Sequence, residues 1–283
     1  MSDIAGTPLR EKNTKLRELL RPMHSVAVAF SAGADSTLVL KVALDVLGLE
    51  NVVAVTGRSD SLARGEFADA VAIARTLGAE HVILDTDEFT NPSYTTNPTN
   101  RCYFCKTTLY THLKRFIAAR GIATMVNGVI ADDLGDYRPV LQAADEHGIR
   151  APLAEAGFTK SDVRELSRQL GLPTHDKPAS PCLSSRIPYG EEVTPAKLRM
   201  IEQAEAFLHE LGIRECRVRH HAGDAARLEV PKEWIGKIGA DDMTPRIDTQ
   251  LRNIGYQSWT IDPKGFRSGS LNELIPLSGP PIR

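Results

Sequence analysis

Short runs of consecutive apolar residues alternate with longer amphipathic stretches through the first half of the chain. The apolar runs predict buried strands, because a strand covered on both faces of a sheet has no polar side. They lie at residues 25–30, 52–56, 81–84 and 123–128. The amphipathic stretches predict helices at residues 36–47, 66–77 and 104–120, each followed by a glycine that can end a helix. Strands that alternate with helices indicate an α/β fold with a doubly wound parallel sheet.

The pattern of the second half is different. The remaining elements are predicted, in order, as a helix at 159–171, a linker at 172–190, a helix from Thr194 to about Leu211, strands near 214–220 and 226–230, a helix near 244–253 and a strand near 256–261. The first of these helices opens with Thr159 and Asp162 at the spacing of a capping box. We therefore predict two domains, an α/β domain over residues 1–178 and a smaller α+β domain over residues 179–283. The linker is rich in proline, serine and threonine, and we expect it to contribute to the active site.

A small-residue loop follows the first predicted strand and opens the first predicted helix. This phosphate loop (residues 31–36) has the sequence Ser-Ala-Gly-Ala-Asp-Ser. Amide groups at a helix N-terminus bind phosphate, and small residues let the phosphate approach the backbone. Ser31, Gly33, Asp35 and Ser36 resemble the Ser-Gly-Gly-x-Asp-Ser loop of the PP-loop ATP pyrophosphatases, which split ATP into AMP and pyrophosphate. Ala32 departs from that pattern, and its methyl group is tolerated only if φ is negative there.

Three of the four cysteines stand in positions that suggest chemistry. Cys102 and Cys105 are separated by two residues, a spacing at which two thiolates reach one metal. Cys182 follows in the linker, and the long Asn-, Pro- and Thr-rich loop predicted at residues 87–101 precedes the pair. Three thiolates suit zinc or an iron–sulfur cluster with one open position, whereas two suit a redox pair. Cys216 alternates with Arg217 on a predicted strand, which places it in the core.

The same strand predicts an anion-binding face in the second domain. Arg217 and Arg219 lie on the side opposite Cys216, and two neighbouring guanidinium groups suit an anion. Glu205 and Glu229 are possible Mg²⁺ ligands, because carboxylates near bound phosphates hold that ion.

Taken in order, these motifs resemble the LarE family of ATP-dependent sulfur transferases. The resemblance spans about residues 15 to 272 and rests on the phosphate loop, Gly128, Asp133, Asp136, Tyr137, Arg138, Ser184, Ser185, Arg186, Pro188 to Gly190, Arg217 to Arg219, Arg227 to Glu229 and Gly265 to Gly269. It implies adenylation of the carboxylates of pyridinium-3,5-biscarboxylic acid mononucleotide and their conversion to thiocarboxylates. The product serves the nickel-pincer cofactor of lactate racemase. Family members either sacrifice the sulfur of one cysteine or carry three cysteines and a [4Fe-4S] cluster, and this chain resembles the second group.

The charge of the candidate residues, together with this resemblance, suggests a role for each of them. ATP binding is expected at Ser31, Gly33, Asp35, Ser36, Thr56 and Gly128, and binding of the substrate or its phosphate at Asp133, Arg138, Ser185, Arg186, Arg217 and Arg219. Cys182, Lys106, Asp35 and Arg186 are the expected catalytic residues, and Cys102, Cys105 and Cys182 the expected ligands of the cluster. The expected cofactors are ATP, Mg²⁺ and [4Fe-4S], and the family tends toward homo-oligomers of six. The sulfide donor is left open.

The composition of the chain narrows the classes of protein to which it can belong. Hydrophobic content of 42% and charged content of 25% are ordinary for a globular protein, and the net charge of −2 does not favour extended nucleic-acid contact. The sequence has neither a membrane-spanning run nor the apolar segment of a signal peptide, so we expect a cytoplasmic protein. A PP-loop tRNA thiolase is the nearest rival, followed by an ammonia-using synthetase such as NAD or GMP synthetase. A nucleotide-binding regulator without turnover is the non-enzymatic rival.

Overall fold

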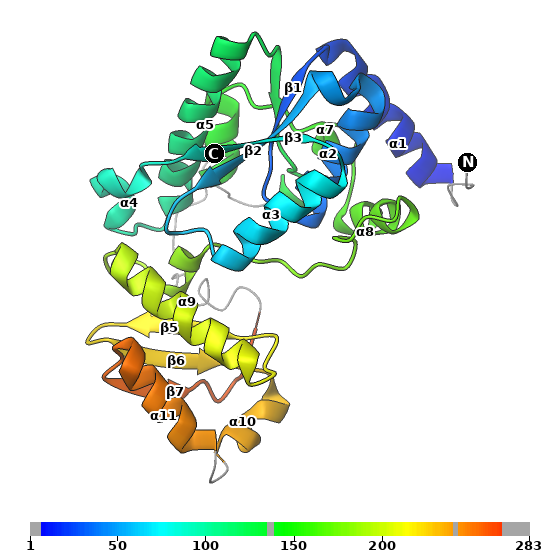
Figure 1. Ribbon diagram of the computed structural model, residues 1–283. Helices are drawn as coiled ribbons and strands as arrows, with labels where there is room; N and C mark the ends of the chain where they lie inside the picture. Colours follow the sequence, from blue (N-terminus) through cyan, green and yellow to red (C-terminus); the bar gives the residue numbers. More distant parts are fainter. Residues whose placement is uncertain (1–6, 135–138, 240–242, 268–283) are drawn as a thin grey trace, which may run out of the picture. The chain divides into compact units, whose positions relative to one another are not determined.

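The computed structural model describes residues 7–134, 139–239 and 243–267 (Figure 1). The chain divides into two compact units, Met1–Tyr94 with Asn100–Ser180, and Thr95–Thr99 with Pro181–Arg283. The division falls after residue 180, where the sequence predicted 178, and the sequence did not predict that Thr95–Thr99 joins the second unit. Within the described residues, no helix is both long enough and apolar enough to cross a membrane.

The first unit is built on a four-stranded parallel sheet, which confirms the predicted fold class. Its strands are β1 (Val26–Ala29), β2 (Val52–Arg58), β3 (Glu80–Asp85) and β4 (Thr124–Val126), in the spatial order β3-β2-β1-β4. The chain moves from β1 through β2 to β3 on one side and returns to the other side of β1 as β4. The switch point therefore lies between the carboxyl ends of β1 and β4, which is where open α/β sheets bind ligands.

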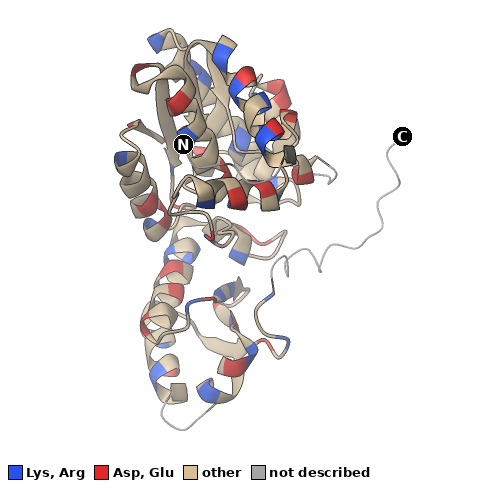
Figure 2. Cartoon of the chain, turned by 90° about the vertical axis from the view of Figure 1, so that its right-hand side faces the viewer, with Lys and Arg blue, Asp and Glu red and all other residues tan. Residues whose placement is uncertain are grey.

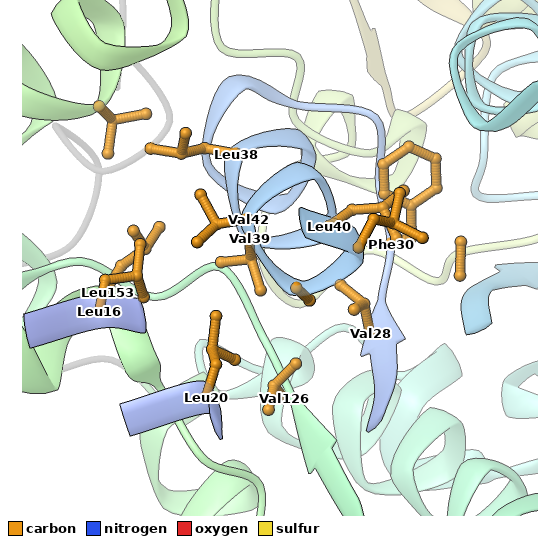
Figure 3. Packing of buried hydrophobic residues seen from close by; sticks show 14 of the residues in the cluster. Leu16, Leu20, Val28, Phe30, Leu38, Val39, Leu40, Val42, Val126 and Leu153 are labelled. Carbon is orange, nitrogen blue, oxygen red and sulfur yellow. The ribbon is translucent and has the colours of Figure 1, made fainter. Parts of the chain in front are cut away.

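Helices cover both faces of this sheet. The described helices of the first unit are α1 (Thr7–Leu20), α2 (Ala34–Leu47), α3 (Arg64–Thr76), α4 (Pro92–Thr95), α5 (Arg101–Arg120), α6 (Pro139–Glu146), α7 (Pro152–Glu155) and α8 (Lys160–Gln169), and all but the short α4 pack on the sheet. One face packs on α1, α2, α3, α7 and α8, in the core that contains the residues labelled in Figure 3. The other face packs on α5 and α6 through Tyr110, Leu113 and Ala143. Alternate strand residues, such as Val26 and Ala27, serve the two cores because side chains alternate along a strand.

The second unit holds a three-stranded mixed sheet. Its strands are β5 (Arg217–His221), β6 (Ala225–Glu229) and β7 (Ser258–Ile261), and its helices are α9 (Pro195–Glu210), α10 (Lys232–Ile238) and α11 (Met243–Ile254). The three helices pack on one face, where Val218 and Leu228 point into the core. Cys216 lies in this core, as predicted, and burial raises the pKa of its thiol to about 12. The opposite face of the sheet carries Arg217, Arg219, Arg227 and Glu229.

The predicted long loop at residues 87–101 is more ordered than its composition indicated. It contains a 3-10 turn (Glu88–Thr90) and α4, and α5 begins at Arg101 rather than near residue 104. Within the second unit, the Asn97 amide donates hydrogen bonds to the carbonyls of Ile187 (3.3 Å) and Pro188 (2.7 Å). The Gly190 N–H returns a bond to the Asn97 carbonyl (2.9 Å). This segment therefore fastens the linker that carries Cys182.

Candidate functional site

The phosphate loop joins β1 to α2 in the order that anion binding requires. Gly33 is the N-cap of α2 and gives the helix no side-chain cap, so the positive end of the helix remains available to an anion. The Ser36 hydroxyl accepts a hydrogen bond from the Ser31 N–H (3.3 Å) and lies 3.2 Å from the Ser31 hydroxyl. The loop thus closes on itself around residues with short side chains.

Ala32 adopts the conformation that the sequence left open. Its φ is +56°, in the left-handed region, and its side chain is fully buried. A left-handed conformation costs a non-glycine residue about 1–3 kcal/mol. The phosphate loop therefore keeps the backbone path that glycine would adopt, and it holds this path with strain.

Gly128 meets the phosphate loop backbone to backbone. A side-chain carbon on Gly128 would lie 2.7 Å from the Ser36 nitrogen and 3.0 Å from the Asp35 carbonyl carbon. Next to it, the buried Asn127 accepts a bond from the Val129 N–H (3.1 Å), whereas its Nδ2 has no partner in the structure. The loops after β1 and β4 therefore touch at the switch point and leave a buried donor there.

Asp35 pairs with a residue that the sequence did not indicate. The Lys160 ammonium lies 2.8 Å from each carboxylate oxygen of Asp35. Lys160 is the first residue of α8, and its backbone N–H donates to Asp132 (2.8 Å). The capping box of Thr159 marked the start of this helix correctly, but no local signal showed that the helix begins beside α2.

Two other candidate residues of the first unit, Thr56 and Asp133, form hydrogen bonds that stabilise the backbone near the phosphate loop and after β4. The Thr56 hydroxyl donates to the Phe30 carbonyl (2.8 Å), directly before the phosphate loop, and therefore accepts from His81 Nε2 (2.8 Å). Burial lowers the pKa of His81. Asp133 accepts from the Ile130 N–H (3.1 Å) and shapes the turn after β4. Direct contact of Thr56 or Asp133 with ligand stays a prediction, and Arg138, Asp136 and Tyr137 lie outside the described residues.

The three candidate ligand thiols are divided between the units. Cys102 and Cys105 lie three positions apart near the N-terminus of α5, on one side of the helix, and both are half-buried. Lys106 follows them and is half-buried too. Cys182 is exposed and immediately precedes the 3-10 turn η5 (Leu183–Arg186) in the second unit. In the part of the chain that the structure describes, no three His, Cys, Asp or Glu side chains are grouped to hold a metal ion.

Arg186 holds the turn that carries Cys182. Its guanidinium donates to the carbonyls of Pro181 (2.6 Å) and Cys182 (3.1 Å) and to the Ser185 hydroxyl (3.0 Å). Its other edge forms two bonds with Glu205, at 2.9 and 3.0 Å. Since Arg186 is 3% exposed, its first role is to shape this turn.

Arg219 and Glu229 form a second buried pair. Two bonds of 3.0 and 2.9 Å join them, and Arg219 also donates to the Ser185 carbonyl (2.6 Å). Glu205 and Glu229 thus already accept bonds from guanidinium groups, an arrangement that disfavours the predicted Mg²⁺ role. Arg219 likewise differs from the predicted clamp, because it positions Ser185 rather than presenting an open fork.

An excess of positive charge remains around these two ion pairs. We call this group of side chains the arginine cluster. Among the described residues it contains five arginines and three carboxylates: Arg186, Arg217, Arg219, Arg227 and Arg267 with Glu205, Glu229 and Asp262. Arg219 and Arg227 stand directly opposite each other on β5 and β6. Arg217 lies over the Phe266 ring at 5.1 Å, and burial, then the charge of Arg186, lowers its pKa. The surplus of two positive charges suits a phosphate monoester.

The fold and the phosphate loop define the class. The chain is 29% identical over 194 residues to the tRNA-specific 2-thiouridylase of Xanthobacter autotrophicus, covering 55% of this chain and 49% of that protein. It has the α/β fold of the PP-loop superfamily. No protein-family model matches the chain.

Two closer relatives match nearly the full length. An uncharacterised protein of Synechocystis sp. is 45% identical over 267 residues, which cover 94% of this chain and 99% of that protein. The pyridinium-3,5-bisthiocarboxylic acid mononucleotide synthase of Lactiplantibacillus plantarum is 40% identical over 267 residues, which cover 94% of this chain and 96% of that protein. The chain belongs to the family of that synthase, the LarE family.

Proposed function

We propose that this protein is an ATP-dependent sulfurtransferase that converts pyridinium-3,5-biscarboxylic acid mononucleotide to the bisthiocarboxylic acid. The observation that carries the proposal is the phosphate loop at the switch point of a LarE-family chain, where the N-terminus of α2 has no side-chain cap. In this reaction a substrate carboxylate attacks the α-phosphorus of ATP and pyrophosphate leaves. A sulfide nucleophile then attacks the carbonyl carbon of the acyl-adenylate and AMP leaves, so that one C–O bond is replaced by a C–S bond.

The first unit supplies the groups for adenylation. The N-terminus of α2 and the hydroxyls of Ser31 and Ser36 hold the pyrophosphate that departs. Asp35 lies in the first turn of α2, and its carboxylate would bind the Mg²⁺ ion that accompanies ATP. Gly128 packs directly against the backbone of Ser36, so the nucleotide cannot pass between them. The loop after β4 therefore limits where the nucleotide can lie.

The second unit supplies the groups for the mononucleotide. The surplus charge of the arginine cluster fits the substrate phosphate, with Arg217 and Arg227 as its binding residues. Arg186 and Arg219 act as positioning residues, because their bonds to Glu205 and Glu229 hold the Ser185 turn. This division of roles explains why buried arginines gather where a structural core would contain apolar residues.

The thiols fit the expected cluster by their chemistry. Cys102, Cys105 and Cys182 all lie outside the hydrophobic core, unlike Cys216, and the positive end of α5 favours anionic ligands at the first two. A bound [4Fe-4S] cluster would supply the open coordination position for the sulfide. Lys106 follows Cys105 on α5 and would stabilise negative charge there. Convergence of the three thiols stays a prediction, as do the cytoplasmic location and the homo-oligomeric assembly.

The distant likeness to a tRNA thiouridylase makes tRNA the main rival substrate. In the view of Figure 2, acidic and basic residues are interspersed along the helices of the first unit, a pattern that does not form the basic stripe needed to neutralise many phosphates. An amide synthetase would use ammonia and need no exposed thiols. A regulator would bind nucleotide and release no pyrophosphate.

One experiment separates these functions. The anaerobically purified protein is incubated with Mg·ATP, sulfide and either the pyridinium mononucleotide or unmodified tRNA, with an ammonia reaction in parallel. We expect AMP, pyrophosphate and a thiocarboxylate, identified by mass, with the mononucleotide only. Thiolated tRNA, an amide product, or nucleotide binding without pyrophosphate release would each replace the proposal with the corresponding rival.

A further inference from the structure

Lys160 and Asp35 occupy a place where a simple surface ion pair is unexpected. Asp35 lies in the first turn of α2, beside the amide groups that would receive phosphate, and Lys160 contacts both of its oxygens at 2.8 Å. The side chains are 38% and 27% exposed, so solvent reaches both. An exposed pair contributes little to stability, and its members can exchange partners at small cost.

The helix that carries Lys160 does not depend on this pair for its position. Val163 and Leu166 of α8 are fully buried against α2 in the main core. The backbone N–H of Lys160 is held by Asp132, and Lys12 ties α8 to α1 through Asp162 at 2.6 Å. The ammonium group is therefore delivered to the phosphate loop by a helix that is already fixed.

The charges of Asp35 and Lys160 suggest what the pair does in the phosphate loop. A lone carboxylate at the mouth of the phosphate loop would repel the β- and γ-phosphates of a nucleoside triphosphate. A lysine at the same place removes the repulsion in the ligand-free loop. When Mg²⁺ arrives with the nucleotide, it can take the Asp35 carboxylate and leave the lysine for a phosphate oxygen.

We propose that Lys160 is a pyrophosphate-binding residue that Asp35 holds in the ligand-free loop and exchanges for Mg²⁺ when the triphosphate binds. The inference rests on the proposed use of ATP and adds a binding residue from α8. It assigns Lys160 to the β- and γ-phosphates, so AMP, which lacks them, does not use it.

The test compares ATP with AMP by calorimetric titration of the full-length protein. Lys160→Gln should weaken Mg·ATP binding about ten- to hundredfold, as expected for a lost charge-assisted contact, and change AMP binding less than about twofold. Lys12→Gln, which removes the other lysine pair of α8, is the matched control and should change neither. Lys160→Arg should recover most of the ATP affinity.

Asp35→Asn gives a prediction in the opposite direction. Without the carboxylate, Lys160 is no longer held back, so metal-free ATP should bind at least as tightly as to the wild type, while the gain on adding Mg²⁺ disappears. A purely structural tether would instead weaken both. In the wild type, inorganic pyrophosphate should slow acetylation of Lys160, followed by mass spectrometry, and not that of Lys12.

The outcomes separate this inference from the proposed function. If the wild type binds Mg·ATP while Lys160→Gln binds it equally well, or loses AMP and ATP alike, Lys160 is structural and the inference is wrong. If pyrophosphate leaves acetylation of Lys160 unchanged in the wild type, the inference is also wrong. This second test needs no variant, so it holds even if Lys160→Gln does not fold. If the wild type itself binds no ATP, the proposed function fails first.

Discussion

Gly128 and Ser36 touch through their backbones, with no room for a side chain between them. A side-chain carbon on Gly128 would lie 2.7 Å from the Ser36 nitrogen, well inside the van der Waals contact distance of the two atoms. The contact joins the ends of β4 and β1 at the switch point of the sheet. Any residue other than glycine must therefore push the phosphate loop away from β4.

Gly128→Ala should lower the free energy of unfolding by about 1–3 kcal/mol, as overpacking does, and reduce ATP affinity because the displaced atoms belong to the phosphate loop. Urea denaturation and ATP titration measure the two effects. Gly65→Ala is the control, since nothing lies within 4 Å of its side-chain position in α3. It should stabilise the protein by about 0.4–1 kcal/mol. An unchanged ATP affinity in Gly128→Ala would show that the loop tolerates the shift.

Ala32 gives a prediction about strain. Ala32→Gly removes a buried methyl group but relieves a φ of +56°. Ala43→Gly removes a methyl group that is equally buried, from the interior of α2, and relieves nothing. The second change should cost about 2 kcal/mol, from helix propensity and lost burial, and the first at least about 1 kcal/mol less. Equal losses in thermal or urea unfolding would mean that the loop is not strained.

The sequence predicted the elements whose signals are local. The four strands, the end of α2 at Gly48 and the capping box of Thr159 each depend on a few consecutive residues, and the structure confirms them. The helix α1 was missed, although Leu9, Leu16 and Leu20 are buried along it. Its polar positions are more numerous than its apolar ones, so periodicity alone gave a weak signal.

The side-chain pairs could not be predicted in the same way. Asp35 and Lys160 are 125 residues apart, and no local pattern relates two surface charges over that distance. Strand alternation correctly placed Arg219 opposite the core, but it could not show that Glu229 would take its guanidinium. The sign of φ at Ala32 was also open, because alanine does not reveal the backbone conformation that glycine suggests.

The ion pair of Arg186 and Glu205 should be sensitive to substitution, because both side chains are buried. Arg186→Met leaves the buried Glu205 carboxylate without its guanidinium partner, although the bond from the Val218 N–H (3.0 Å) remains, and we expect the free energy of unfolding to fall by about 3–5 kcal/mol. Adding Glu205→Gln should recover part of it, since the buried charge is removed. Arg168→Met, which breaks an exposed pair on α8, should have far less effect. Similar losses from both single changes would contradict this interpretation.

Three histidines should make stability depend on pH. Burial lowers the pKa of His81, of His220 and of His221, with Lys197 adding to the effect at His220. The unfolded chain therefore binds protons at a pH where the folded chain does not, so the free energy of unfolding falls as pH drops below about 6.5. Urea unfolding from about pH 5 to 8 measures the slope, and His220→Gln should reduce it. The exposed His209→Gln is the control, and a slope that His220→Gln leaves intact would exclude His220 as a source.

The last prediction concerns the thiols. Cys102→Ser, Cys105→Ser and Cys182→Ser should each lose iron, acid-labile sulfide and repeated turnover, because each thiolate holds one iron of the expected cluster. ATP binding should persist in all three, since the phosphate loop lies on β1 and α2 rather than on α5 or the linker.

Cys216→Ala is the matched control. Its thiol is buried in the core of the second unit and unavailable as a ligand, so this variant should keep iron, sulfide and activity. Iron and sulfide analysis with thiocarboxylate yield per enzyme decides the matter. A full cluster and several turnovers in Cys182→Ser would rule out the three-thiol site. If the wild type loses the sulfur of Cys182 after one turnover, seen by mass, the protein uses that side chain as the sulfur source instead.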